Sequence, residues 1–512
     1  MSDRILVSRR GFLAGTSALM AGARAWPEST GPVRTAQLTD LSAAEAVDRM
    51  HCGELSAESY AKALLERCAS AKPLNAFITL EPDRVLSEAR AADQLRARGA
   101  RLGPLHGLPI PVKDSVNTRD YPTTVGTAAL RHFRPAEDAP LVAQLRGAGA
   151  IVLGKTNLHE LSYGWTSNNH AFGAVHNPYD TSRVPGGSSG GTAAAVAAHI
   201  APLGIAADTE GSIRVPAALC GLVGFRPTTG RYHSAGVAPI TALFDQVGPV
   251  ARSMRDIELF DRVVAGGGGS PGVPNLRSIR LAVCRSYFFE GIDPEVARVT
   301  DAALAKLRAA GVTIVETGIP TLGELVSRIT DQVQYHDTAP SLTRYLAEYK
   351  TGVTFEQLVA QAGEDIRATF AQYVLPGGSD VVTDEAYRRI VGDYLPRLRA
   401  VLRATFESTK ASALVFPATM TTAPRIGDDG TLSLGGRKVS FDVAMSRNIA
   451  PASTAGLPGL VIPAGLAANG LPVALEFDGP AGSDRALLGL GVAIERLLGR
   501  EPPPRAVGMV GT

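Results

Sequence analysis

The chain has 512 residues, and 51 Lys and Arg residues against 49 Asp and Glu residues leave a formal charge of +2. This balance argues against a nucleic-acid-binding protein, which usually carries a marked basic excess, and the 6% aromatic content argues against a platform for stacking bases. With 45% hydrophobic and 20% charged residues, we expect most of the chain to fold around a packed core.

We expect residues 1–25 to be an export signal rather than part of the fold. Arg9 and Arg10 precede an apolar run that is too short to span a bilayer, and Ala23-Arg-Ala25 is typical of a cleavage site. The adjacent arginines resemble the twin-arginine type of signal, which indicates a protein of the bacterial periplasm or exterior. The alternative is an ordinary amphipathic helix. No later stretch predicts a stable membrane anchor.

The cysteine pattern predicts neither a metal site nor a disulfide between the two nearest cysteines. Cys52 and Cys68 end two helices expected over 42–52 and 57–69, so about 12 helical residues hold them about 18 Å apart, too far to bond. No CxxC motif or His-rich cluster is present. We therefore expect four buried or partly buried thiols, at Cys52, Cys68, Cys220 and Cys284.

The first half of the chain alternates between helical and extended patterns. Residues 36–100 have helical spacing, with Ser42 and Ser56 as N-cap candidates. From about 104 to 265, short apolar strands and helices alternate: a strand at 107–112, a helix at 141–149, and strands at 150–153 and 201–207 on either side of a helix at 192–200. This alternation predicts an α/β protein with a mainly parallel sheet covered by helices.

The second half continues the pattern after a flexible loop at Gly266–Pro271. A strand at 279–284, a helix at 294–310 and a strand at 313–316 form one more βαβ unit. Residues 321–411 are helical throughout and predict an inserted helical subdomain that shapes the pocket. Strands at 414–417 and 459–463 then return to the sheet.

Two clusters of glycine and serine carry the candidate chemistry. Pro185–Thr192 leads into a helix, where backbone N–H groups and the helix dipole favour negative charge, and Asp208–Pro216 follows the end of a strand, where α/β sheets build their sites. Lys113 ends another apolar strand, where burial lowers the pKa of a lysine toward that of a useful base. Alone, each feature is more typical of a loop, a helix cap or a solvated lysine. Together they indicate a serine nucleophile with a lysine base and no histidine.

These residues closely resemble the amidase signature family. Lys113 matches the catalytic lysine of the family, Ser188 its bridging serine in a cis peptide, and Ser212 its nucleophile, with separations of 75 and 24 residues. No Gly-x-Ser-x-Gly elbow surrounds either serine, so an α/β-hydrolase is not indicated. The resemblance covers about 40 to 500 and extends to Leu105–Asp114, Gly154–Asn157, Ala171–Gly173, Asn177-Pro178, Leu222–Thr228, Ala455–Pro458 and Gly470–Val473.

The resemblance implies one amidase domain over 36–505, built on a large mixed, mostly parallel twisted sheet with helices on both faces. It implies that Lys113 draws a proton through Ser188 from Ser212, which attacks a carbonyl and forms an acyl-enzyme. The backbone N–H groups of Thr209, Glu210, Gly211 and Ser212 would form the oxyanion hole. Ser189, Asp208 and Arg214 would hold the loops rather than do chemistry. No cofactor or metal is implied.

One residue departs from the family pattern. The family usually has two glycines before the nucleophile, and this chain has Glu210 and Gly211. A side chain at this position could resist an unusual backbone angle, and a carboxylate could repel the developing oxyanion. We expect Glu210 to point into solvent or toward an arginine. The alternative is a changed substrate preference, for instance toward cationic groups.

The sequence around 159–169 looks most like that of amidases of arylacetamides, of the indoleacetamide and mandelamide hydrolase type. Tyr163 and Trp165 could line an aromatic acyl pocket or pack in the core. We expect an exported enzyme with a small-molecule amide substrate, no nucleic-acid partner and a possible homodimer. The alternatives are an esterase or carbamate hydrolase with the same triad, a glutamyl-tRNA amidotransferase A-like subunit, and an exported binding protein without turnover.

Overall fold

The computed structural model describes residues 35–266, 269 and 271–504, so the predicted export signal and part of the glycine-rich loop lie outside the described residues. The described residues belong to one structural unit that begins at Thr35. Within it, no helix has both the length and the apolar composition needed to cross a membrane.

The predicted N-terminal helices are present and begin at the predicted caps. Helix α1 (Thr35–Thr39) is followed by α2 (Ala43–Cys52), α3 (Ala57–Ser70) and α4 (Pro82–Ala97). Ser42 and Glu45 form a reciprocal capping box at the start of α2, and the Ser56 hydroxyl accepts a hydrogen bond from the Ser59 N–H at the start of α3. These bonds satisfy N–H groups that the first turn of a helix cannot pair internally.

In the described residues the central sheet has 11 strands, in the order β1-β3-β2-β6-β8-β7-β14-β15-β11-β9-β10. The strands are β1 (Phe77–Thr79), β2 (Pro109–Lys113), β3 (Ile151–Thr156), β6 (Leu203–Asp208), β7 (Val223–Arg226), β8 (Gln246–Ala251), β9 (Arg280–Val283), β10 (Thr313–Glu316), β11 (Ala413–Pro417), β14 (Gly459–Leu466) and β15 (Pro472–Asp478). The predicted large mixed sheet is confirmed.

Parallel pairing is confined to two blocks of this sheet. Strands β3, β2 and β6 are parallel neighbours, as are β11, β9 and β10. The strands from β6 through β8, β7, β14 and β15 to β11 pair antiparallel, and so does β1 with β3. The expected parallel pairing therefore holds within the two blocks and not between them, where β8, β7, β14 and β15 each pair antiparallel with both neighbours.

Helices cover both faces of the sheet, as predicted. Successive strand residues point to opposite faces, and Val461 of β14 packs with residues of α6 (Gly190–Ala197) and α7 (Arg214–Leu219). Its neighbours Leu460 and Ile462 belong to another buried hydrophobic cluster, the larger of the two. That cluster includes residues of α8 (Met254–Val264), α10 (Pro294–Ala309) and α18 (Asp484–Leu498). The active-site helices α6 and α7 thus share one face.

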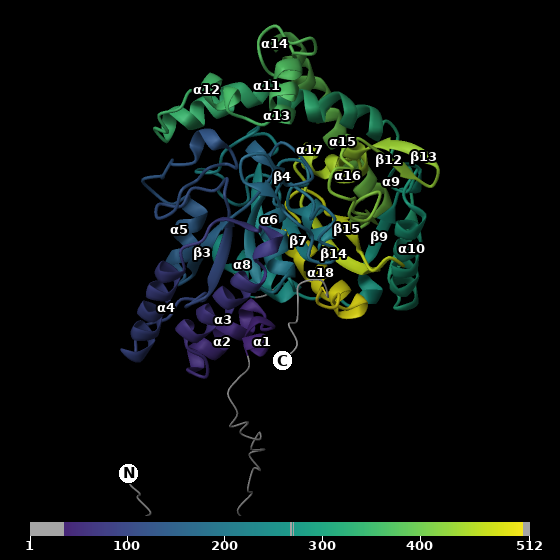
Figure 1. Ribbon diagram of the computed structural model, residues 1–512. Coiled ribbons are helices and arrows are strands. Elements are labelled where there is room, and N and C mark those ends of the chain that lie inside the picture. The colour runs from purple at the N-terminus through teal and green to yellow at the C-terminus, as the bar shows by residue number, and fades with distance from the viewer. Residues whose placement is uncertain (1–34, 267–268, 270, 505–512) are drawn as a thin grey trace, which may run out of the picture. The chain divides into compact units, whose positions relative to one another are not determined.

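Residues 321–411 form the predicted helical segment. It comprises α11 (Leu322–Glu348), α12 (Phe355–Ala360), α13 (Glu364–Tyr373), α14 (Asp384–Arg389), a π-helical turn at Ile390–Tyr394 and α15 (Leu395–Thr409). Helix α11 contacts α12, α13, α14 and α15, and Figure 1 shows this group gathered together. Between this segment and β14 lie the short helices α16 (Phe441–Ser446) and α17 (Ala450–Ala455).

The four cysteines are free thiols, and the expectation that all are at least partly buried is wrong for one of them. Cys68, Cys220 and Cys284 are buried, whereas Cys52 is exposed. Cys52 is the last residue of α2, and Gly53 turns the chain away in a left-handed conformation. The end of this helix therefore leaves the thiol facing solvent.

The core packing of β14 can be tested with one pair of leucines. Leu460 is completely buried in the centre of the sheet, whereas Leu95 on α4 is 51% exposed. Leu460→Ala should lower the free energy of unfolding by about 2–5 kcal/mol because it leaves a cavity. Leu95→Ala should change it by less than about 0.5 kcal/mol. Urea denaturation followed by circular dichroism measures both, and equal effects would contradict the assigned packing.

Candidate active site

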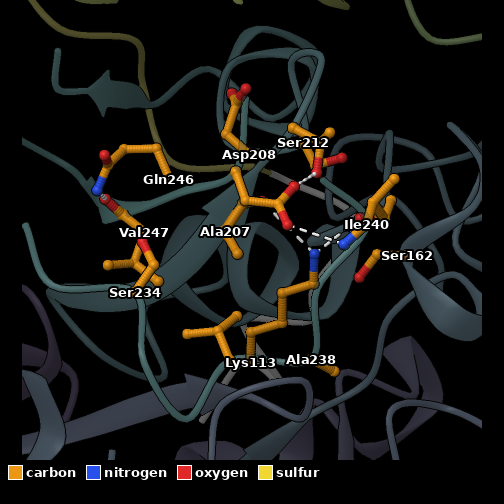
Figure 2. A pocket seen from close by; sticks show the side chains of 14 residues that line it. Lys113, Ser162, Ala207, Asp208, Ser212, Ser234, Ala238, Ile240, Gln246 and Val247 are labelled. Atoms are coloured by element: carbon orange, nitrogen blue, oxygen red, sulfur yellow. Dashed lines mark hydrogen bonds between the residues drawn. The ribbon is translucent and has the colours of Figure 1, made fainter. Parts of the chain in front are cut away.

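The sheet brings the predicted lysine and both serines to one pocket. Lys113 and Asp208 are the last residues of the parallel neighbours β2 and β6, so they lie at the same edge of the sheet. Lys113 Nζ donates a hydrogen bond of 2.7 Å to Ser188 Oγ, and both side chains are completely buried. Lys113, Ser188 and Ser212 line the same pocket, into which the lysine points (Figure 2).

Burial makes Lys113 a base. Removal of the ammonium from water lowers its pKa to about 7, although the negative charges of Asp208 and Asp245 act in the opposite direction. The neutral amine is therefore well populated near neutral pH. A neutral amine within hydrogen-bonding distance of the Ser188 hydroxyl can accept its proton.

The loop that carries Ser188 is fixed from several sides. The peptide bond between Gly187 and Ser188 is cis, as the family resemblance implied. The Ser188 carbonyl accepts hydrogen bonds from the His159 N–H at 3.0 Å and from Ser167 Oγ at 3.3 Å. Ser189 Oγ donates to the Ala207 carbonyl at 3.1 Å, which ties the loop to β6. Ser189 is thus placed to position its neighbour Ser188.

Asp208 organises the loop that carries Ser212. Its carboxylate accepts hydrogen bonds from the N–H groups of Gly211 at 2.7 Å and Ile213 at 3.1 Å, on either side of the nucleophile. Arg214 Nε and Arg226 Nη1 each donate to the same carboxylate at 3.1 Å. These contacts hold the pKa of Asp208 well below its usual value despite its burial. Asp208 therefore stays ionised, and its hydrogen bonds hold the loop.

Arg214 links this carboxylate to β15 and α17. The guanidinium is completely buried and also donates to Glu476 on β15 and to Ser453 Oγ on α17. Its hydrogen bonds thus join the nucleophile loop to a strand and a helix far away in the sequence.

The two residues before the nucleophile, Glu210 and Gly211, differ in backbone conformation. Gly211 has a φ of +115°, and a Cβ atom there would lie 2.5 Å from Ile449 Cγ2, so glycine is required. Glu210 is not among the residues with positive φ, so its side chain causes no backbone strain.

Glu210 points neither into solvent nor toward an arginine, and that expectation is wrong. Its side chain is only 7% exposed, and its Oε2 accepts a hydrogen bond of 2.6 Å from Gln334 Nε2 on α11. Burial raises the pKa of Glu210 well above its usual value, and the nearby Asp331 raises it further. This shift favours the protonated form of Glu210, which carries no charge that would repel an oxyanion.

The predicted oxyanion hole also needs one correction. The Gly211 N–H already donates to Asp208 Oδ1, so it is not free to stabilise an oxyanion. Of the predicted donors, Thr209, Glu210 and Ser212 keep backbone N–H groups near the nucleophile.

The aromatic residues predicted for the acyl pocket lie outside the lining of the triad pocket. Tyr163 packs edge-on against Phe370 of α13, with 5.0 Å between ring centroids, and its hydroxyl contacts Thr338 of α11. Trp165 packs against a buried cluster that includes Phe441 and Met445 of α16. Both side chains therefore make the packing contacts that were the alternative to a pocket role.

Several residues that line the pocket were not predicted from the sequence, and Ser162 and Asp245 are two of them. Ser162 lines it with a left-handed backbone, φ +63°, and Asp245 lies beside it at the end of a loop. Asp245 accepts hydrogen bonds from Thr209 Oγ1 at 2.6 Å and from the N–H of Ile240 at 2.8 Å, and burial raises its pKa to about 6. Neither residue belongs to a glycine-rich motif, so no local pattern could have revealed them.

The pocket holds a buried lysine that is hydrogen-bonded to one serine, and a second serine lies in the same lining. No histidine is among the lining residues. This arrangement defines a serine hydrolase that uses a lysine base. No group of three or more potential metal ligands occurs within the described part of the chain.

Comparison with known proteins identifies the family. The profile of the Amidase family matches residues 60–488. A mandelamide hydrolase of Pseudomonas putida is 37% identical over 487 residues, covering 92% of this chain and 94% of that protein. An indoleacetamide hydrolase of Agrobacterium vitis is 35% identical, and the match covers 89% of this chain and 97% of that protein. The X-ray structure of peptide amidase from Stenotrophomonas maltophilia matches with a TM-score of 0.77 at 30% identity, and the match covers 91% of this chain and 98% of that one. The chain belongs to the amidase signature family and is an amide hydrolase.

The protonation state of Lys113 predicts how activity depends on pH. Its neutral form is the base and becomes populated as the pH rises through its pKa of about 7, so kcat/KM should rise over this range and level off above it. Lys113→Met should lower kcat/KM by about 10³-fold or more. Lys62→Met, at an exposed lysine on α3, should leave the profile intact. An acid-favoured profile would contradict the assignment of Lys113 as the base.

Proposed function

We propose that this protein hydrolyses a small arylacetamide-like carboxylic amide to the acid and ammonia or an amine, through an acyl-enzyme on Ser212. The observation that carries the proposal is the 2.7 Å contact between Lys113 Nζ and Ser188 Oγ in the pocket that Ser212 also lines. The names of the mandelamide and indoleacetamide hydrolase relatives support an arylacetamide.

The arrangement accounts for each proton in the first half-reaction. Neutral Lys113 accepts a proton from Ser188 as Ser188 accepts one from Ser212, and the Ser212 oxygen forms a bond to the amide carbon. Backbone N–H groups of residues 209, 210 and 212 stabilise the oxyanion, and each such donor can contribute about 3 kcal/mol. As the C–N bond breaks, the proton returns through Ser188 to the leaving nitrogen.

Water completes the second half-reaction by the same route. Water attacks the carbonyl carbon of the Ser212 ester and gives a proton through Ser188 to Lys113. As the bond between that carbon and the Ser212 oxygen breaks, the proton returns through Ser188 to the Ser212 oxygen, and the carboxylic acid is released. Esters and carbamates could enter the same acyl-enzyme pathway, so the leaving group must be decided by experiment. The family membership favours amides.

A panel of amides tests the proposal directly. Wild-type protein should release ammonia from phenylacetamide, mandelamide and indoleacetamide faster than from aliphatic amides. Ser212→Ala should abolish release, because it removes the attacking oxygen, with a loss of about 10³-fold or more in kcat. Ammonia is measured by a coupled assay and the acid by chromatography.

Matched esters and carbamates in the same panel decide between the amidase and its alternatives. Mass spectrometry of protein quenched during turnover should find the acyl group on the peptide that contains Ser212. Turnover of esters alone would replace the amidase with an esterase. An absence of turnover on every substrate, with Ser212 intact, would favour a binding protein.

We propose further that the protein is exported to the bacterial periplasm or exterior by the twin-arginine route. The support is the Arg9-Arg10 pair ahead of a short apolar run and the Ala23-Arg-Ala25 sequence. Mass spectrometry of the protein from its native cells should give a chain that begins near Trp26. An intact Met1 would contradict export. A homodimer is also proposed, and sedimentation of the purified chain would test it.

A further inference from the structure

The three oxyanion donors of the proposed mechanism are held by different parts of the chain. The carboxylate of Asp208 accepts hydrogen bonds from the N–H groups on either side of Ser212, so it fixes the donor at residue 212. Thr209 and Glu210 lie outside this pair of bonds, and other groups hold their side chains. The contacts of these two side chains therefore help to set the direction of their backbone N–H groups.

Glu210 is joined directly to helix α11. Gln334 Nε2 donates a hydrogen bond of 2.6 Å to Glu210 Oε2, and the side chains of Gln334 and Glu210 are only 8% and 7% exposed. Removal of either group would leave the other buried without this partner, which is costly. This first connection thus fixes Glu210 against the helix.

Thr209 is joined to the same helix through one neighbouring loop. The Thr209 hydroxyl donates to Asp245 Oδ1 at 2.6 Å. The other carboxyl oxygen of Asp245 accepts from the N–H groups of Ile240 at 2.8 Å and Thr241 at 3.1 Å. The Thr241 hydroxyl donates at 2.6 Å to Asp337 Oδ2 on α11. This second connection is therefore an unbroken series of short hydrogen bonds.

Both connections end on one face of α11. Gln334 and Asp337 are three residues apart in this helix, a spacing that places side chains on the same face. The helix is held on either side of them. Thr330 Oγ1 lies 2.6 Å from Thr454 Oγ1 on α17, and the Tyr387 hydroxyl on α14 donates to Asp337 at 3.1 Å. A single stretch of α11 therefore holds the side chains of two successive oxyanion-loop residues.

We propose that Gln334 and Asp337 are positioning residues, which aim the N–H groups of Thr209 and Glu210 at the oxyanion. This inference rests on the proposed amide hydrolysis and deepens it by giving α11 a part in stabilising the transition state. Neither side chain lines the triad pocket, so each acts through the loop. Donors that are fixed in advance need no rearrangement when charge develops. A glycine at position 210 would offer α11 no side chain to bind.

Variants that break one connection at a time test the proposal. Gln334→Leu breaks the first connection and Thr241→Val the second, and both keep a similar side-chain volume. Each should lower kcat about tenfold or more and change KM by less than about twofold, because the donors bind the transition state more strongly than the substrate. Asp337→Leu breaks the second connection without altering Thr241 and should match Thr241→Val. Initial rates on the fastest amide of the panel measure these values.

Benzylboronic acid gives a readout that a merely structural role would not change. The Ser212 oxygen adds to boron as its proton passes through Ser188 to Lys113, and the resulting tetrahedral adduct has no leaving group. One oxygen of this adduct takes the place of the oxyanion, so the inhibition constant should rise by about the factor by which kcat falls. A smaller fraction of folded protein would lower the measured kcat and leave the inhibition constant unchanged.

Two matched controls make the same substitutions elsewhere. Gln332→Leu alters the same helix, but Gln332 lines a separate recess with Arg328 and Tyr394. Thr300→Val alters a completely buried threonine of α10 whose hydroxyl has no hydrogen-bond partner among the described residues. Both controls should keep kcat and the inhibition constant within about twofold of the wild type.

Exchange of the two bonded groups tests the first connection by rescue. Gln334→Glu removes the donor, sets two carboxyl groups against each other and should lower kcat. Addition of Glu210→Gln to this variant again places an amide opposite a carboxyl group and should raise kcat about fivefold or more above Gln334→Glu alone. This pair and Thr241→Val keep the proposal testable if Gln334→Leu fails to fold, which thermal denaturation followed by circular dichroism would show.

The outcomes separate this inference from the proposed function. With an active wild type, an unchanged kcat in both Gln334→Leu and Thr241→Val would overturn the positioning role and leave the amidase intact. A fall in kcat without a rise in the inhibition constant would also overturn it. A wild-type protein that turned over no amide would overturn both the proposed function and this inference.

Discussion

The buried carboxylate of Asp208 is the interaction on which the active site depends. It binds two guanidinium groups and the two N–H groups that flank Ser212, so a single anion sets both the path of the nucleophile loop and its attachment to the sheet. Arg214 carries the constraint to Glu476 on β15, and Arg226 carries it to the Phe244 carbonyl. A buried charge is tolerated here because every oxygen is bonded to a positive or polar partner.

The same carboxylate explains how a lysine can be neutral beside an aspartate. Asp208 favours the protonated form of Lys113, but its charge is already neutralised by Arg214 and Arg226, so the loss of hydration dominates and the lysine becomes a base. Burial raises the pKa of Asp245 to about 6, so Asp245 is still mostly ionised at pH 7 and also favours the protonated form of Lys113, without outweighing the loss of hydration. Asp208 thus stays ionised, whereas burial favours the neutral forms of Lys113, Asp245 and Glu210.

Local sequence was sufficient for features that local contacts decide. Residues close in sequence predict the serine caps of α2 and α3 and the strands that end at Lys113 and Asp208. The spacing typical of the family predicts the triad. The antiparallel centre of the sheet and the partner of Glu210 were not predicted, since they arise between segments far apart in the chain: Gln334 lies 124 residues after Glu210. Apolar strand patterns are similar for either direction of pairing, and a carboxylate in a loop carries no mark of its distant partner.

The position of β15 has a consequence for biosynthesis. This strand, Pro472–Asp478, lies inside the sheet between β14 and β11, and its Glu476 is bonded to Arg214 across 262 residues of chain. Contacts of such separation cannot form while the ribosome still holds the C-terminal segment, and long-range strand pairing is slow to form. The bond that ties the Ser212 loop to β15 can therefore form only after residues 472–478 have been synthesised.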